Sequence, residues 1–101
     1  MPFYVVHALD RQGSDDVRAA NRPAHRLRLR EHDHPVSVRV GGPLLDDRGQ
    51  MCGTLLIVEA GTEQEVAEFL AADPYVVAGL YEDVSIRGFN WGLGRPGESD
   101  G

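Results

Sequence analysis

The chain has 101 residues and a formal net charge of −6 at pH 7, with 42% hydrophobic and 26% charged residues. This length and composition predict one soluble globular domain whose core has little surplus stability. The negative charge argues against nucleic acid and against an anionic membrane as partners, because both bind through clustered cations.

The cellular location can be narrowed from the same sequence. Cys52 is the only cysteine, so no intrachain disulfide can form, and a reducing compartment is favoured. The first residues lack the basic region and apolar run of a signal peptide, and no apolar stretch is long enough to span a bilayer. We therefore expect a cytoplasmic protein that does not enter a membrane.

The first part of the chain predicts a strand, a helix and a second strand. Residues 3–9 are aromatic and β-branched, which is typical of a strand buried on both faces. A helix can begin after Ser14, but Pro23 either kinks it or delays its start, because proline removes a backbone donor and clashes one turn back. We expect a loose first turn and a firm helix over 21–32, followed by an alternating strand over 36–40.

The middle of the chain predicts a β-hairpin. Gly41-Gly42-Pro43 is expected to end the preceding strand, and the polar residues 44–50 form the connection. Residues 51–59 are strongly apolar and pair most easily with the strand just before them.

A second helix and a last strand complete the predicted domain. Thr62 and Glu65 have the spacing of a capping box, in which a hydroxyl and a carboxylate satisfy each other's backbone amides at a helix start. Asp73-Pro74 ends this helix, because the residue before a proline disfavours the α conformation. One short helical turn follows, and residues 81–89 alternate as the last strand.

The element order is βαββαβ, which predicts a ferredoxin-like α+β sandwich with an antiparallel four-stranded sheet and two helices on one face. We expect this domain over residues 1–90 and a flexible tail, rich in glycine, proline and acid, over 91–101. The other face of the sheet is left bare, and its apolar strands would be exposed. We therefore expect a homodimer that covers this face.

This topology brings two distant segments to the same end of the sheet. The two helices run antiparallel, so the start of the first lies beside the end of the second. Arg22 and His25 then lie near Asp73, at a cleft rim that also collects Asp10 and Tyr75. A histidine beside an aspartate is a pair that can move protons.

Three motifs in order on this layout resemble the YciI-like (YCII-related) family over residues 3–90: Arg22-Pro23-Ala24-His25, Gly41-Gly42-Pro43 and Asp73-Pro74-Tyr75. The resemblance implies a ferredoxin-like subunit that forms a dimer, related to the dimeric α/β-barrel proteins. It also implies a pocket with a His–Asp pair, carried here by His25 and Asp73. Most such proteins have no assigned reaction, and a minority resemble small-molecule lyases that act on chlorinated or hydroxylated aromatic intermediates.

The predicted catalytic pair is His25 with Asp73. The carboxylate would hold one tautomer of the imidazole and leave the other ring nitrogen to move a proton. Such acid–base help is enough for an elimination or isomerisation of an activated substrate without a metal. The alternative is structural: Asp73 caps the turn that begins at Pro74, and His25 packs beside it.

Five further residues are predicted to bind the substrate, each with a structural alternative. Arg22 can hold a carboxylate or phenolate oxygen, or pair with a surface acid. Gly42 and Pro43 let backbone approach a ligand, or form a plain turn. Tyr75 lines the pocket, or packs as a half-buried core aromatic. His7 faces a dimer cleft, or is a hydrogen-bonded core histidine.

No metal or cofactor is expected. His32-Asp33-His34 has metal-ligand residue types, but no third partner occurs at a convincing spacing. The favoured function is a cofactor-free lyase or isomerase that binds a small anionic or aromatic molecule. A non-catalytic anion-binding protein and a structural dimer module are the alternatives.

Overall fold

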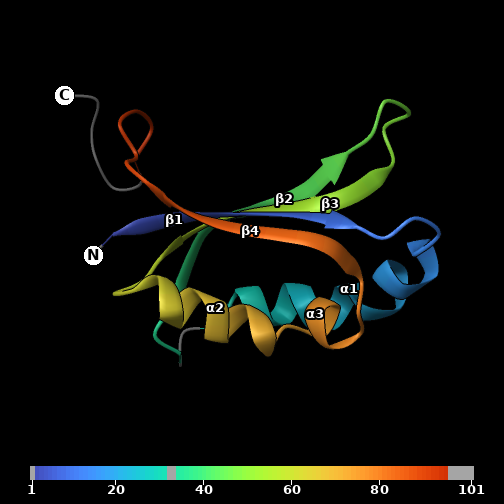
Figure 1. The fold of residues 1–101 in the computed structure, drawn as a ribbon, viewed down its shortest axis with the longest axis horizontal. Coiled ribbons are helices and arrows are strands. Elements are labelled where there is room, and N and C mark those ends of the chain that lie inside the picture. The colour runs from blue at the N-terminus through green and yellow to red at the C-terminus, as the bar shows by residue number, and fades with distance from the viewer. Residues whose placement is uncertain (1, 32–33, 96–101) are drawn as a thin grey trace.

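The computed structural model describes residues 2–31 and 34–95. Its helices pack against one face of a single antiparallel sheet (Figure 1). In chain order the elements are β1 Phe3–Asp10, α1 Asp15–Leu29, β2 Ser37–Leu45, β3 Met51–Glu59, α2 Glu63–Ala71, α3 Pro74–Val77 and β4 Tyr81–Phe89. The strand order β2-β3-β1-β4 is that of a ferredoxin-like sheet, so the predicted fold class is confirmed.

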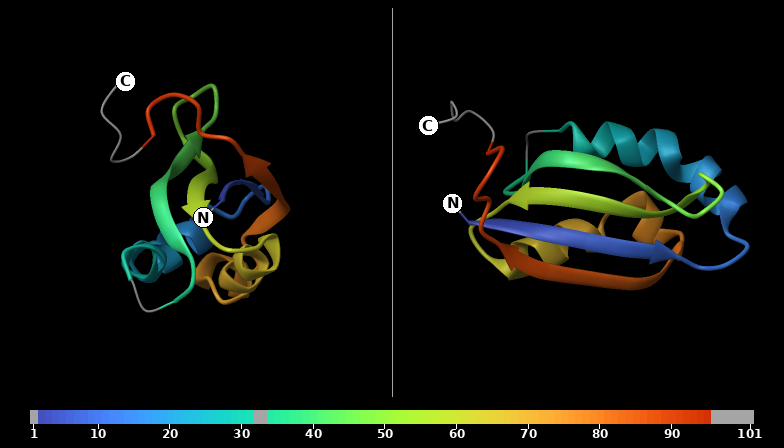
Figure 2. Two further views of the ribbon diagram at one scale, coloured as in Figure 1. Left: turned by 90° about the vertical axis from the view of Figure 1, so that its left-hand side faces the viewer. Right: turned by 90° about the horizontal axis from the view of Figure 1, so that it is seen from above.

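The core lies between the sheet and the helices. Along the two central strands every second side chain points toward the helices. Val6 of β1 is paired with Leu56 of β3, and both are buried against Val66 and Phe69 of α2. Figure 2 shows α1 along the β2 edge of the sheet, and α2 with α3 beneath β1 and β4.

The first helix is longer and begins earlier than predicted. It starts at Asp15, continues through Pro23 and ends at Leu29, so the expected firm helix over 21–32 is wrong at both its start and its end. Pro23 is tolerated because it is exposed, as is Ala19, whose carbonyl loses its helical donor and can turn to water. Acidic residues in the first turn also favour the helix start.

The second strand is also longer than predicted. Gly41-Gly42-Pro43 does not end it, because these residues continue the pairing with β3 and the strand runs to Leu45. β2 is an edge strand, where a proline is accommodated since one side of the backbone has no partner strand.

The second half of the chain follows its prediction closely. Thr62 Oγ1 accepts the Glu65 N–H at 3.2 Å, and Glu65 Oε1 accepts the Thr62 N–H at 3.1 Å, so the capping box is present. Asp73 then caps the single turn of α3. β3 and β4 have the bounds expected from the residue pattern.

Among the described residues, the sheet face opposite the helices is uncovered except at its Phe3 end, where Trp91 packs. Phe3, Val5, His7 and Leu9 alternate with the helix-facing residues of β1. The prediction that this strand is buried on both faces is therefore wrong for one chain, because every helix lies on the other side (Figure 1).

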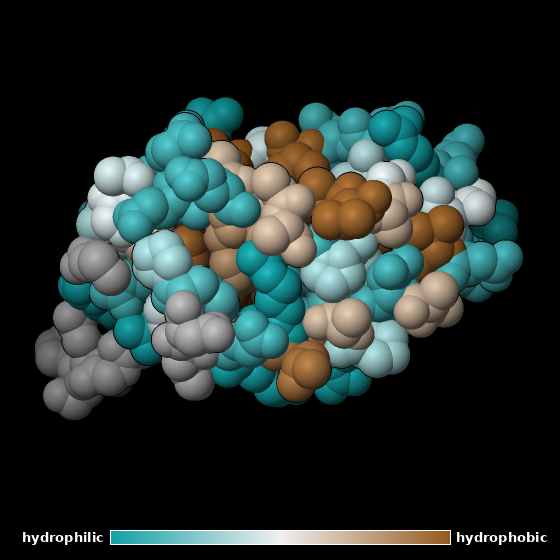
Figure 3. Space-filling view, turned by 90° about the horizontal axis from the view of Figure 1, so that it is seen from below, coloured by the Kyte–Doolittle hydropathy of each residue, from teal (hydrophilic) through white to brown (hydrophobic). Residues whose placement is uncertain are grey.

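The outer surface of the helix layer is mixed in character. Apolar residues lie among hydrophilic ones there (Figure 3), and Leu27 of α1 and Val77 of α3 are among the exposed apolar side chains. Within residues 2–31 and 34–95, no helix combines the length and apolarity needed to cross a membrane.

The first residue of the predicted tail contacts the sheet. The Trp91 ring packs edge-on against Phe3, with ring centroids 5.4 Å apart, and lies 6.0 Å from Phe89. Residues 96–101 lie outside the described part of the chain. A flexible tail over 91–101 therefore stays a prediction.

Candidate active site

The predicted contact between His25 and Asp73 is present. His25, on α1, is 5% exposed, and Asp73, at the start of α3, is 1% exposed. The Nδ1 atom of His25 lies 2.9 Å from both carboxylate oxygens of Asp73. An ionised carboxylate only accepts hydrogen bonds, so Nδ1–H donates and Nε2 is left as the basic nitrogen.

Asp73 also serves the backbone of the turn that it begins. Its Oδ1 accepts the Tyr75 N–H at 2.9 Å, so it is the N-cap of α3. The two readings of this residue from the sequence are therefore compatible: one carboxylate caps the turn and orients His25. Capping holds the carboxylate in place, which in turn defines the direction of the imidazole.

Tyr75 forms one wall beside the pair. Its ring stacks on the His25 imidazole with centroids 4.0 Å apart and an interplanar angle of 22°. Burial raises the pKa of the Tyr75 hydroxyl, and the charges of Arg18 and Arg22 offset only part of this effect. The hydroxyl is therefore neutral near pH 7.

A second buried pair, which the sequence analysis did not identify as a pair, lies on the other side of Tyr75. Arg18 is 6% exposed, and its Nε and Nη2 atoms donate to the Asp10 carboxylate at 2.6 and 2.9 Å. Its Nη2 also donates to Thr54 Oγ1 at 2.9 Å, and Tyr81 donates to the same oxygen at 2.8 Å. The Arg18 guanidinium lies 4.7 Å from the Tyr75 ring centroid.

The position of Arg18 at the site could have been predicted from the helical period. Positions 18, 22 and 25 are spaced by four and three, so they share one face of a helix that starts early enough. The predicted start near residue 21 excluded Arg18 from that face. Burial alone lowers the pKa of Arg18, but the hydrogen bond and charge of Asp10 outweigh this effect and raise it.

Arg28 places a permanent positive charge near the His25–Asp73 pair. Its Nη1 atom lies 3.7 Å from Asp73 Oδ2 and makes no hydrogen bond within the described residues. Its guanidinium stacks over the Phe69 ring at 4.1 Å. Asp73 therefore has a nearby permanent cation in addition to its hydrogen bond with the imidazole.

The pair borders a cavity of about 340 Å³ between α1 and the sheet. Five residues predicted from the sequence line it: Arg22, His25, Gly42, Pro43 and Tyr75. A larger hollow of about 740 Å³ lies along α1 and shares Arg18, Arg22, Arg26 and Arg30 with it. The smaller cavity is the candidate site, because His25 and Tyr75 line only that one.

Three predicted residues do not line this cavity. Asp73 is buried behind His25, and Asp10 is engaged by Arg18. His7 is exposed on the uncovered face of the sheet, so the alternative of a core histidine is wrong. It lies on the face opposite the cavity, and its predicted role at a dimer cleft stays a prediction.

The metal-ligand types noted at 32–34 are only partly within the described residues. Residues 32 and 33 lie outside them, and the ring of His34 packs 4.7 Å from that of Phe69. Among residues 2–31 and 34–95, no three His, Cys, Asp or Glu side chains are grouped so that they could hold a metal ion.

The fold and the cavity define a class: a small α+β subunit with a buried His–Asp pair between a helix and an antiparallel sheet. The YCII-related domain matches residues 2–90. The chain belongs to this family, and the resemblance described above is confirmed.

Relatives of known sequence and structure agree with this assignment. Protein YciI of Escherichia coli O6:H1 is 34% identical over 93 residues, which is 86% of this chain and 95% of that protein. An uncharacterized protein of Haemophilus influenzae is 30% identical over the same shares of the two chains. The structure of 5-chloro-2-hydroxyhydroquinone dehydrochlorinase (TftG) from Burkholderia phenoliruptrix AC1100, in complex with 2,5-dihydroxybenzoquinone, has a TM-score of 0.76 and 32% identity. The match covers 87% of this chain and 93% of TftG.

Proposed function

We propose that the protein is a cofactor-free small-molecule enzyme of the lyase or isomerase type. The observation that carries the proposal is the buried His25, which is oriented by both oxygens of Asp73 and borders a cavity of about 340 Å³. The similarity to a dehydrochlorinase that binds a quinone supports the same reaction class. The substrate is then a small anionic or hydroxylated aromatic molecule.

The geometry suggests a role for each residue in an elimination. Nε2 of His25 accepts a proton from the substrate, and the electron pair released forms the new double bond as the leaving group departs with its own pair. Asp73 stabilises the imidazolium that forms. Arg22, which lines the cavity, holds an oxyanion of the substrate, and Gly42 and Pro43 form the opposite wall.

The proposal includes a cytoplasmic homodimer formed through the uncovered sheet face. Val5 is paired with Ile57 there, and Leu9 and Val40 are 38% and 40% exposed. Apolar strands on this face lose water when a second copy covers them. Light scattering at micromolar concentration tests this part, and a monomer at that concentration would contradict it.

A non-catalytic anion-binding protein is the second candidate. The arginines that line the cavity favour it, because they bind an anion whether or not a proton moves. This alternative predicts saturable binding without a product. A purely structural module predicts neither binding nor turnover, and only lower stability when His25 is changed.

Turnover of chlorinated and hydroxylated hydroquinones tests the proposal, with His25→Ala and His25→Asn as variants. Asparagine keeps a donor near Asp73 but cannot accept a proton. Both variants are expected to lower kcat by a factor of about 10²–10⁴, with an unchanged circular dichroism spectrum. Glu68→Gln, at an exposed position of α2 outside the cavity, is the control and keeps its activity. Full activity of His25→Asn would show that this residue is not the acid–base group.

A further inference from the structure

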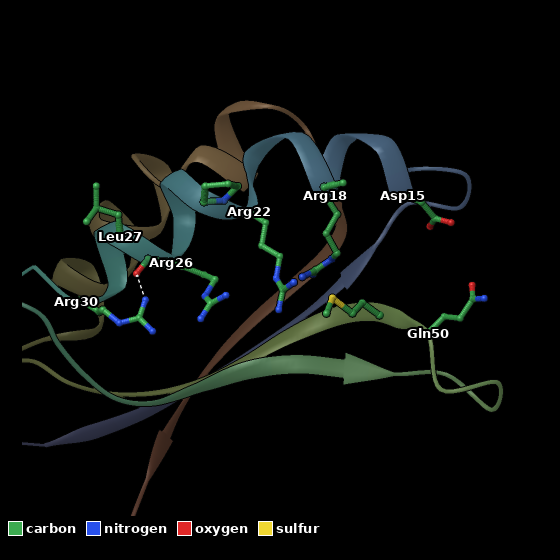
Figure 4. A pocket seen from close by; sticks show the side chains of 10 residues that line it. Asp15, Arg18, Arg22, Arg26, Leu27, Arg30 and Gln50 are labelled. Atoms are coloured by element: carbon green, nitrogen blue, oxygen red, sulfur yellow. Dashed lines mark hydrogen bonds between the residues drawn. The ribbon is translucent and has the colours of Figure 1, made fainter.

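α1 carries four arginines in register: Arg18, Arg22, Arg26 and Arg30. They are spaced by four residues, so they project from one face of the helix, and successive positions are separated by about 6 Å along its axis. Figure 4 shows these side chains extending from α1 toward β2 and β3, whereas Leu27 points away. All four line both the cavity at His25 and the larger hollow beside it.

Among the described residues, only the first of these arginines has a carboxylate partner. Arg18 is paired with Asp10, but no described acid lies within ion-pair distance of Arg22, Arg26 or Arg30. Arg30 donates a hydrogen bond to the Arg26 carbonyl at 3.0 Å. This bond uses one nitrogen of the Arg30 guanidinium but provides no negative charge to balance it.

This run of like charges is unfavourable for the helix itself. Like-charged side chains four residues apart destabilise a helix, and the chain as a whole carries a net charge of −6. The cavity at His25 and the adjoining hollow, which together form a groove along α1, are therefore locally cationic in an otherwise acidic protein. A bound anion would relieve the repulsion between these guanidinium groups.

The groove also has an apolar side. Leu29 and Val38 line it beside the arginines, and Gly41 and Pro43 of β2 contribute no charge. Arg39, across the groove, is already paired with Glu59. An elongated molecule with an apolar body and an anionic end fits this distribution better than a compact inorganic ion.

We propose that Arg26 and Arg30 form a second anion subsite, so that the substrate is an elongated dianion. Its reacting ring lies at His25, with one oxyanion on Arg22. Its second group, a carboxylate or a phosphate, reaches one or two helical turns further along α1, about 6–12 Å away. This inference rests on the proposed role of the His25 cavity, and it assigns a substrate class to that site.

Binding of matched aromatic anions tests the subsite separately from catalysis. Benzoate carries one anionic group, terephthalate carries two carboxylates, and 4-carboxyphenyl methyl phosphate, whose phosphodiester carries a single charge, replaces one carboxylate by a phosphate group. Calorimetry at 150 mM salt is expected to show that the wild-type chain binds at least one dianion about tenfold more tightly than benzoate. The tighter of the two dianions identifies the second group.

Substitutions on α1 test whether Arg26 and Arg30 cause the preference for the dianion. Arg26→Gln/Arg30→Gln should abolish the preference for the dianion and leave benzoate binding unchanged. Arg48→Gln/Arg87→Gln removes the same charge at two exposed positions that line neither hollow, in the β2–β3 connection and on β4, and should keep the preference. Equal affinity of the wild-type chain for benzoate and both dianions would overturn the subsite, as would equal losses in the two double variants.

The proposed catalytic role of His25 and the proposed anion subsite can be tested separately. If His25→Asn turns over substrate as well as the wild-type chain while Arg26→Gln/Arg30→Gln loses the dianion preference, the subsite stands and the acid–base role is wrong. If His25→Asn is inactive and the arginine variants bind normally, the catalytic role stands and the subsite is wrong.

Discussion

Two buried pairs, each formed by N–H donors and a carboxylate, flank the ring of Tyr75, and they differ in one chemical respect. His25 with Asp73 and Arg18 with Asp10 both join α1 to a carboxylate at the end of another segment, with distances of 2.6 to 2.9 Å. Histidine can gain or lose a proton near neutral pH, whereas arginine stays charged. Similar geometry therefore places an ionisable imidazole on one side of Tyr75 and a fixed charge on the other.

This difference predicts that the two carboxylates have different mutational effects. Loss of Asp10 leaves a permanent charge buried without a counter-ion, so it should mainly reduce stability. Loss of the Asp73 charge leaves an imidazole that can become neutral, so it should mainly reduce activity. Variants at both positions test this difference.

The largest expected effect on stability is that of Asp10→Ala. It should lower the free energy of unfolding by about 3–5 kcal/mol, because the nearly buried guanidinium of Arg18 keeps its charge and loses its partner. Urea denaturation measures the change. Asp47→Ala, at an exposed acid in the β2–β3 connection, is the control and should shift stability by less than about 0.5 kcal/mol. A loss as small as that of the control would mean that the Arg18 pair contributes little.

The second-largest expected effect on stability is that of Asp73→Asn. The amide oxygen can still accept from His25 Nδ1–H or from the Tyr75 N–H, so stability should fall by only about 1–2 kcal/mol. Activity should fall by a factor of about 10² or more, because the imidazolium that forms during proton transfer loses its counter-charge. Kinetics and urea denaturation on the same preparation separate the two effects. Unchanged kcat with the same loss of stability would assign Asp73 to capping alone.

The smallest expected effect is that of Tyr81→Phe, which removes the hydrogen bond to Thr54 in the Arg18 network. The cost near pH 8 should be about 1 kcal/mol. Burial raises the pKa of Tyr81 in the folded chain, despite the opposing hydrogen bond with Thr54. The unfolded chain therefore releases this proton at a lower pH than the folded chain. The contribution of Tyr81 to the free energy of unfolding is constant below about pH 10 and falls as the pH rises further.

Removal of the hydroxyl should therefore flatten the alkaline decline. Unfolding free energies measured by urea between pH 8 and pH 11 test this expectation, with a slope of at most about 1.4 kcal/mol per pH unit for one such group. Tyr75→Phe/Tyr81→Phe should flatten the decline further, because burial also raises the pKa of Tyr75. An identical decline in the wild-type chain and both variants would exclude the tyrosines as its source.

Local patterns determined most of the architecture. The capping box of Thr62 and Glu65, the apolar run over 51–59 and the alternation over 81–89 depend on residues close together in sequence, so they could be identified without the fold. Strand order followed from the connection rules, and it brought His25 and Asp73 together across 48 positions. The predicted contact is therefore a consequence of topology.

Only the tertiary structure decided where the chain tolerates prolines and which partners the charged residues have. Pro23 remains within α1 because that face is exposed, and Pro43 remains within β2 because the strand is at an edge. Arg18 and Arg22 are the same residue type one helical turn apart, yet Asp10 reaches only the first. Exposure and ion pairing depend on the packing of segments distant in sequence, and no short-range pattern contains that information.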